Sequence, residues 1–209
     1  MEKSIWNKFL PLACCLLLLL ASCSEQDDTI EEFPNWPVTN DAYYTNLVTQ
    51  AQAKKAAGDT TWDLFTSYSK PSTGYGYQPQ DYVVIERLES ATGIDLRSPA
   101  LTDTVQVHYV GHLIPSADKY KTNGMEFDRS YSGVFNPEKA TPAKFGVVSV
   151  VNGFSTALLH MHRGDHWRVY IPYQLGYGTT VRGGIPAGST LIFDLRLVDF
   201  WRKQKGDLN

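Results

Sequence analysis

The chain has 209 residues, of which 43% are hydrophobic, 20% charged and 12% aromatic, a composition typical of a globular protein and not of a disordered chain. This length suffices for one ordinary domain with attachments. The formal net charge is only −3 and the sequence has no long run of Lys and Arg, so we expect no nucleic-acid partner.

The N-terminus has the pattern of a signal peptide. Two lysines precede an apolar stretch that ends at Leu20 and is short for a membrane span. The sequence Leu-Ala-Ser-Cys at residues 20–23 resembles a bacterial lipobox, which implies cleavage after residue 22 and a lipid on Cys23. We therefore expect a signal peptide over residues 1–22 and a lipoprotein of the cell envelope, with an uncleaved anchor as the alternative.

The three cysteines of the chain agree with this interpretation. Cys14 and Cys15 lie within the expected signal peptide, and Cys23 would carry the lipid. The mature domain then keeps no thiol, so it forms no disulfide and depends on its core for stability.

Residues 24–39 are acidic and contain two prolines, which predicts a solvated tether between the lipid and the domain. The acidic residues directly after Cys23 also resemble an export signal with which some Gram-negative bacteria send lipoproteins to the cell surface. The periplasmic face and the outer surface of the outer membrane therefore both stay open as locations.

A helix is predicted over residues 41–57, with Asn40 as its N-cap and Gly58 at its end. Its apolar stripe consists of Tyr44, Leu47, Val48 and Ala51. An isolated helix of this length is marginal in water, so the stripe should pack against the domain that follows. Residues 69–80 are rich in Pro, Gly, Ser and Tyr, so residues 23–80 are interpreted as tether, helix and linker.

From residue 81 on, the hydrophobic period changes to two, which indicates antiparallel strands with one buried face. The alternation is clearest over residues 105–109, 166–171 and 191–198, and shorter strands are expected at 82–88 and 144–148. A short helix is predicted where apolar residues recur at helical spacing, ending at Gly164; these residues are Phe154, Ala157, Leu158 and Met161. Together these elements predict an α+β domain.

The order of short motifs in this region resembles that of the FKBP-type peptidyl-prolyl cis-trans isomerases. The matching stretches are Val-Gln-Val-His-Tyr-Val-Gly at 105–111, Glu-Phe-Asp at 126–128, Val-Val-Asn-Gly-Phe at 150–154, Met-His-Arg-Gly at 161–164, Ile-Pro-Tyr-Gln-Leu-Gly-Tyr-Gly at 171–178, Gly-Ile-Pro at 184–186 and Ser-Thr-Leu-Ile-Phe-Asp at 189–194. Over residues 81–201 the resemblance implies a five-stranded antiparallel sheet, curled as a half-barrel around one short helix, with a ligand cavity between helix and sheet. Residues 202–209 would form a polar tail.

The resemblance also implies which residues form the site. Tyr177 and the backbone N–H of Val151 are expected to bind the substrate carbonyl, and Asp128 is expected to orient Tyr109. The residues at the family's substrate-binding positions are Tyr109, Phe127, Phe145, Val150, Phe154, Ile185 and Phe193. A single buried aromatic residue is more often plain core, so only the complete set indicates a site.

Three features depart from the family pattern. Residues 111–127 and 128–145 are several residues longer than in compact members, so we expect elaborated loops beside the cavity. Ala143 stands where an aromatic residue is frequent, which predicts a more open wall. Phe154 stands where Trp is frequent, which keeps an apolar ring but loses the indole N–H.

Other site chemistries fit the sequence poorly. His160, His162 and His166 do not share one helix face, so no metal is expected. The glycine-rich residues 176–184 lack the Lys-Ser/Thr of a phosphate-binding loop. No thiol remains for Cys-His catalysis, and no Gly-x-Ser-x-Gly elbow is present. We expect no cofactor.

By resemblance, the chain is a peptidyl-prolyl isomerase that assists the folding of exported or envelope proteins, binds proline-containing polypeptides and takes macrolides such as rapamycin. Two alternatives remain: a non-catalytic FKBP-like binding module or chaperone on a lipoprotein, and a structural lipoprotein whose helix positions another complex. We also expect the domain of residues 81–201 to fold without residues 24–80.

Overall fold

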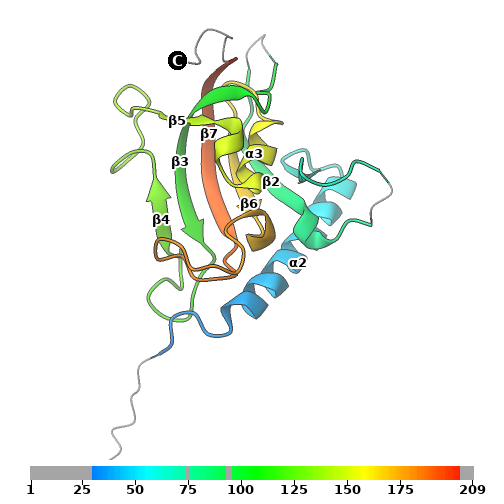
Figure 1. The fold of residues 1–209 in the computed structure, drawn as a ribbon, viewed down its shortest axis with the longest axis vertical. Coiled ribbons are helices and arrows are strands. Elements are labelled where there is room, and N and C mark those ends of the chain that lie inside the picture. Colours follow the sequence, from blue (N-terminus) through cyan, green and yellow to red (C-terminus); the bar gives the residue numbers. More distant parts are fainter. Residues whose placement is uncertain (1–29, 74–75, 93–95, 203–209) are drawn as a thin grey trace, which may run out of the picture. The chain divides into compact units, whose positions relative to one another are not determined.

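The computed structural model describes residues 30–73, 76–92 and 96–202, and Figure 1 shows the arrangement of their helices and strands. The expected signal peptide, the lipidated Cys23 and the tail beyond residue 202 lie outside these described residues. The described residues from Glu31 onward belong to one compact unit. None of the described helices is both long and apolar enough to cross a membrane.

Within the described residues, seven antiparallel strands form one sheet. They are β1 (Trp62–Thr66), β2 (Tyr82–Glu89), β3 (Asp103–Leu113), β4 (Glu126–Arg129), β5 (Ala143–Gly146), β6 (His166–Ile171) and β7 (Leu191–Arg202). Their order is β1-β2-β6-β7-β3-β4, and β5 also pairs with β3. Strand β7 pairs with one edge of β3 over its whole length. On the other edge of β3, β5 pairs with residues 104–107 and β4 with residues 110–112. Figure 1 shows β3 and β7 side by side in the middle of the sheet.

The expected α+β class with an antiparallel sheet is confirmed, whereas the expected number of five strands is wrong, because the sheet of the described residues has seven. The two strands that the sequence did not reveal are β1 and β4. All five residues of β1 are half-buried, so this edge strand lacks a period of two. Strand β4 has only four residues, of which three are charged. Neither segment therefore shows the alternation on which strand prediction depends.

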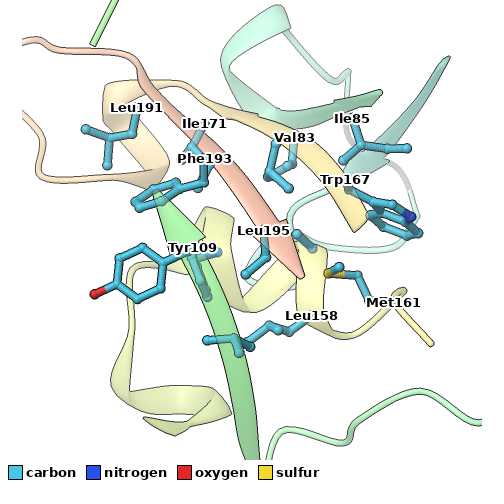
Figure 2. Close-up of a cluster of buried hydrophobic side chains, with 14 of the residues drawn as sticks. Val83, Ile85, Tyr109, Leu158, Met161, Trp167, Ile171, Leu191, Phe193 and Leu195 are labelled. Carbon is cyan, nitrogen blue, oxygen red and sulfur yellow. The ribbon is translucent and has the colours of Figure 1, made fainter. Parts of the chain in front are cut away.

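The main core lies between one face of the sheet and α3 (Asn152–Leu158). Figure 2 shows Leu158 and Met161 from this region beside Leu195 of β7 and Trp167 of β6. The α-helix ends before the expected Met161, which is still fully buried. A Cβ on Gly153 would lie 2.3 Å from Cγ2 of Ile171, so this glycine permits the close approach of α3 to β6.

The longer helix, α2 (Trp36–Ala56), begins earlier than expected, with Pro37 in its first turn. Asn40 is not its N-cap. The buried Asn40 side chain donates to the Trp36 carbonyl at 2.8 Å and accepts from the Thr190 N–H at 2.7 Å. Asn40 therefore joins the helix to the segment that enters β7.

The two helices cover opposite faces of the sheet, because successive residues of a strand point to opposite sides. Val83 of β2 belongs to the main core with α3, whereas Val84 and Tyr170 pack against α2. The expected apolar stripe of α2 is buried there, which confirms its packing on the following domain. The Tyr44 hydroxyl lies 2.9 Å from the carbonyl oxygens of both Tyr82 and Tyr170. Helix α2 thus covers a sheet face that residues 81–201 alone would expose.

The expected tether over residues 24–39 is wrong from Glu31 onward, since these residues pack on the domain. The Glu32 carboxylate accepts N–H donors from Lys119 at 2.9 Å and Tyr120 at 3.2 Å, and the Phe33 ring packs edge-on at 4.8 Å from the Trp36 ring. Because the Glu32 carboxylate accepts several N–H groups, it holds this segment against the loop that follows β3.

The expected boundary between residues 80 and 81 does not separate two units, because β1 pairs with β2 across it. An ion pair joins the two ends of the expected linker over residues 69–80. The Lys70 amine lies 2.6 Å from the buried Asp81 carboxylate. At the other end of the domain, Arg202 belongs to β7 and not to the expected tail.

Candidate active site

A cavity of about 540 Å³ lies where β3, β4, β5 and β7 meet the start of α3 and the segment that leads into β7. Its lining residues are Tyr109, Asp128, Phe145, Ser149, Val150, Val151, Phe154, Gly176, Tyr177, Thr180, Arg182 and Phe193. This set contains all of the sequence-predicted site residues except Phe127 and Ile185. The structure thus brings together residues that are scattered between Tyr109 and Phe193.

Aromatic rings form the floor of the cavity. The Phe193 ring of β7 packs edge-on against Phe154 of α3, with centroids 5.0 Å apart, and lies 6.0 Å from the Tyr109 ring. The Phe145 ring of β5 lies 6.0 Å from Tyr109 on another side. Edge-to-face packing of this kind fixes the rings and leaves an apolar surface toward the cavity.

Phe127 and Ile185 lie behind this lining. The Phe127 ring is 5.5 Å from the Phe193 ring, and Ile185 is buried in the main core. A Cβ on Gly111 would lie 2.6 Å from Cζ of Phe127 and 2.9 Å from Cε1 of Phe193, so this glycine lets both rings approach β3. The two residues support the wall of the cavity and do not line it.

The Tyr109 phenol donates a hydrogen bond of 2.8 Å to Oδ2 of Asp128, and the Arg129 N–H donates one of 2.8 Å to Oδ1. Figure 2 shows the Tyr109 hydroxyl pointing away from the surrounding core side chains. Burial, and then the bond to Asp128 and its charge, raise the pKa of Tyr109 well above its usual value of 10. Tyr109 is therefore a neutral donor at physiological pH, and both carboxylate oxygens are engaged.

Tyr177 lies after a short turn that holds it at the cavity. The Gly178 N–H donates to the Tyr173 carbonyl at 2.8 Å, and the Gly188 N–H donates to the Gly178 carbonyl at 3.0 Å. Among the described residues, neither the Tyr177 hydroxyl nor the Val151 N–H has a hydrogen-bond acceptor. Both donors are therefore available to a bound carbonyl group.

Sequence reasoning missed four lining residues: Ser149, Gly176, Thr180 and Arg182. The Arg182 guanidinium carbon lies 5.2 Å from the centroid of the Tyr177 ring. Thr180 and Arg182 follow Tyr177 by three and five positions, and the folded hairpin brings them to the cavity.

Of the two long stretches, residues 111–127 and 128–145, only the end residues Asp128 and Phe145 belong to the cavity lining. The loop after β3 donates the N–H groups of Lys119 and Tyr120 to the Glu32 carboxylate. The loop after β4 places Phe135 edge-on against His108, with ring centroids 5.0 Å apart. His108 alternates along β3 with Tyr109, so this loop covers the opposite face of the sheet. Ala143 is not among the lining residues, and the more open wall expected from its small side chain stays a prediction.

The three histidines considered as metal ligands have other surroundings. The His160 ring stacks on Phe65 with centroids 3.9 Å apart, and burial lowers its pKa. His162 Nδ1 lies 3.4 Å from the Asp165 carboxylate, and the two ring nitrogens of His166 face Glu89 and Asp194. Within the described ranges, no group of three or more His, Cys, Asp or Glu side chains is arranged to hold a metal ion.

Comparison with known proteins gives a consistent result. The family model described as FKBP-type peptidyl-prolyl cis-trans isomerase matches residues 96–198. FK506-binding protein 2 of Aspergillus oryzae is 39% identical over 108 residues, which cover 51% of this chain and 71% of the relative. The macrophage infectivity potentiator of Trypanosoma cruzi is 38% identical over 125 residues, 59% of this chain and 56% of the relative.

A similar fold is present in the crystal structure of FkpA from Escherichia coli, with a TM-score of 0.52 and 26% identity over 79% of this chain and 61% of that one. The chain thus spans little more than half of the T. cruzi relative and three fifths of the FkpA structure. The similarity to the Aspergillus relative covers most of that protein, and the family model covers the strands and helix that build the cavity. This chain therefore belongs to the family of FKBP-type peptidyl-prolyl cis-trans isomerases.

Proposed function

We propose that this chain is a peptidyl-prolyl cis-trans isomerase whose active site is the aromatic cavity. The observation that supports this most directly is the combination of apolar rings with two unpaired donors, the Tyr177 hydroxyl and the Val151 N–H. The reaction needs no cofactor, because no bond is broken and no proton is transferred.

The chemistry follows from the nature of the X–Pro bond. Rotation about it breaks amide resonance against a barrier of about 18–20 kcal/mol. The planar amide is more dipolar than the twisted one, so an apolar, water-poor cavity disfavours the ground state relative to the transition state. The rings of Phe145, Phe154 and Phe193 supply this environment, and contacts to the pyrrolidine ring stabilise the twisted geometry.

Each polar residue of the site has a distinct proposed role. The Tyr177 hydroxyl and the Val151 N–H donate to carbonyl oxygens of the substrate. Asp128 is a positioning residue, because its carboxylate accepts from the Tyr109 phenol and takes no part in proton transfer. Phe127 and Ile185 act from behind the lining by supporting the rings and the loop that contact substrate.

The same cavity would accept a macrolide such as rapamycin, in competition with peptide. The apolar rings of Phe145, Phe154 and Phe193 would contact the macrolide as they contact the pyrrolidine ring. Rapamycin should therefore inhibit isomerisation with simple competitive kinetics.

We further propose that the chain is an outer-membrane lipoprotein, held by a lipid on Cys23, which assists the folding of exported or envelope proteins. The lipobox-like sequence at residues 20–23 supports this location. Replacing Cys23 with Ala should release the protein from the membrane fraction, whereas the matched variant Cys15→Ala should stay there with its lipid. Membrane retention of Cys23→Ala with unchanged mass would refute the lipid anchor.

The activity is tested with a protease-free isomerisation assay on a series of Xaa-Pro peptides, using the chain from residue 24 onward. Acceleration that rapamycin abolishes is expected. A protein that binds one of these peptides but accelerates none would instead be the non-catalytic binding module that the sequence leaves open. A protein that neither binds nor accelerates would support the structural lipoprotein.

A further inference from the structure

The cavity lining contains two charged side chains, Asp128 and Arg182, and they differ in their surroundings. Both Asp128 oxygens accept hydrogen bonds from within the protein, from Tyr109 and from the Arg129 N–H. Arg182 is exposed, and its guanidinium has no carboxylate partner among the described residues. The cavity mouth therefore presents a cation whose hydrogen-bond donors are available.

The backbone of Arg182 is held in a tight hairpin. The Arg182 N–H donates to the Ile185 carbonyl at 3.1 Å, and the Ile185 N–H donates back to the Arg182 carbonyl at 2.9 Å. The two residues between them, Gly183 and Gly184, have φ angles of 55° and 85°, which suit glycine in such a turn. Because Ile185 is itself buried in the core, this pairing fixes the point from which the arginine side chain extends.

The side chain is also directed by the cavity. Its guanidinium lies over the ring of Tyr177, 5.2 Å from the centroid, which is within the range of a cation-π contact. Tyr177 is the residue proposed to hold a substrate carbonyl. A peptide bound there would pass within reach of the guanidinium, whose planar fork of donors matches a carboxylate.

We propose that Arg182 is a specificity-determining residue that favours prolyl substrates with an acidic side chain next to the proline. This inference rests on the proposed isomerase function, since it concerns the same cavity. The preference is modest, about two- to fivefold in kcat/KM, because an exposed ion pair contributes little in water. It decreases as salt is added, because ions screen exposed charges.

The test uses peptides that differ only in having Glu, Gln or Lys directly before or directly after the proline. For the wild-type chain from residue 24 onward, the Glu/Gln ratio of kcat/KM should be about two to five at low salt for at least one of the two positions. In Arg182→Gln the ratio should fall to about one, and in Arg182→Glu it should invert in favour of Lys. Lys139→Gln removes an exposed positive charge outside the cavity lining and should keep the wild-type ratio.

The outcomes separate the two proposals. If the Gln peptides are isomerised but the Glu/Gln ratio is one at both positions, the role of Arg182 is overturned and the isomerase function stands. If Lys139→Gln changes the ratio as much as Arg182→Gln, the preference is a property of the net charge and the role of Arg182 is again overturned. If no peptide is isomerised, the isomerase function fails, and the ratio of peptide dissociation constants for wild type and Arg182→Gln then decides whether Arg182 selects acidic ligands.

Discussion

Tyr109 and Asp128 show how single residues determine the chemistry of the cavity. The buried phenol stays protonated, and its bond of 2.8 Å holds the carboxylate at the edge of the site. The carboxylate is exposed, so its importance lies in orienting Tyr109 and not in fold stability.

Replacing Asp128 separates positioning from charge. Asp128→Ala should lower kcat/KM less than loss of a group that donates to substrate, because the Tyr109 ring stays in place and only its hydroxyl loses an acceptor. The loss in transition-state stabilisation should not exceed about 1–3 kcal/mol. Asp128→Asn retains an acceptor oxygen and should recover much of the activity in the same steady-state assay. Equal losses in both variants would show that the negative charge itself is required.

Phe193 is both a core residue and a cavity residue, since it is 5% exposed and contacts the rings of Tyr109, Phe127 and Phe154. Phe193→Ala should cost about 3–5 kcal/mol in the free energy of unfolding, because it leaves a void beneath the site. Urea denaturation measures this loss. A cost below about 1 kcal/mol would mean that the neighbouring rings close the void.

Buried tyrosines predict how stability changes at high pH. Burial raises the pKa of Tyr44 and of Tyr109, and it raises that of Tyr170 to about 12. The unfolded chain ionises its tyrosines near the usual pKa of about 10 while the folded chain holds these three neutral. Their stabilising contribution is therefore complete below pH 10, and it is lost as the pH rises toward and through the pKa values of these tyrosines in the folded state.

Urea denaturation between pH 8 and pH 11 tests this dependence. The free energy of unfolding should fall above about pH 10, and less steeply in Tyr44→Phe, which lacks one of the three groups. An unchanged slope in that variant would exclude Tyr44 as a contributor.

At the scale of elements, α2 is part of the domain and not an appendage. Its stripe packs on Val84 and Tyr170, the Trp36 indole N–H donates to the Ser189 hydroxyl at 2.7 Å, and β1 extends the sheet. The folding of residues 81–201 alone stays a prediction, and these contacts add the expectation that the isolated fragment is less stable.

A truncation tests this conclusion. A fragment of residues 81–202 should lose several kcal/mol in the free energy of unfolding relative to residues 31–202, because it exposes the sheet face that α2 covers. Denaturation of both fragments measures the difference, and binding of a hydrophobic dye reports the exposed face. Equal denaturation midpoints would show that α2 contributes little.

These elements also show what the sequence could predict. Strands β3, β6 and β7 alternate clearly, because one face of each is buried against α3, and the motif order identified most of the cavity. Strand β1 and the tertiary bonds of Asn40 depend on contacts between distant segments, which no local pattern records. Arg182 was missed for the same reason, since only the folded hairpin brings its guanidinium over Tyr177.

At the scale of the whole molecule, the compact unit from Glu31 onward contains a complete cavity. The proposed lipid on Cys23 would tie this unit to a membrane. The cavity would then be available to polypeptides that pass through the envelope.

The most direct test of this account is a comparison of prolyl isomerisation by the wild-type chain and by Tyr177→Phe, with circular dichroism as the control for folding. The variant retains the ring that packs at the cavity and removes only the hydroxyl, which has no partner among the described residues. The account predicts that the wild type accelerates isomerisation and that Tyr177→Phe is folded but slower, by roughly the factor of 2–10 that one net hydrogen bond provides. A wild-type protein that accelerates no Xaa-Pro peptide, or a folded Tyr177→Phe of undiminished activity, would contradict it.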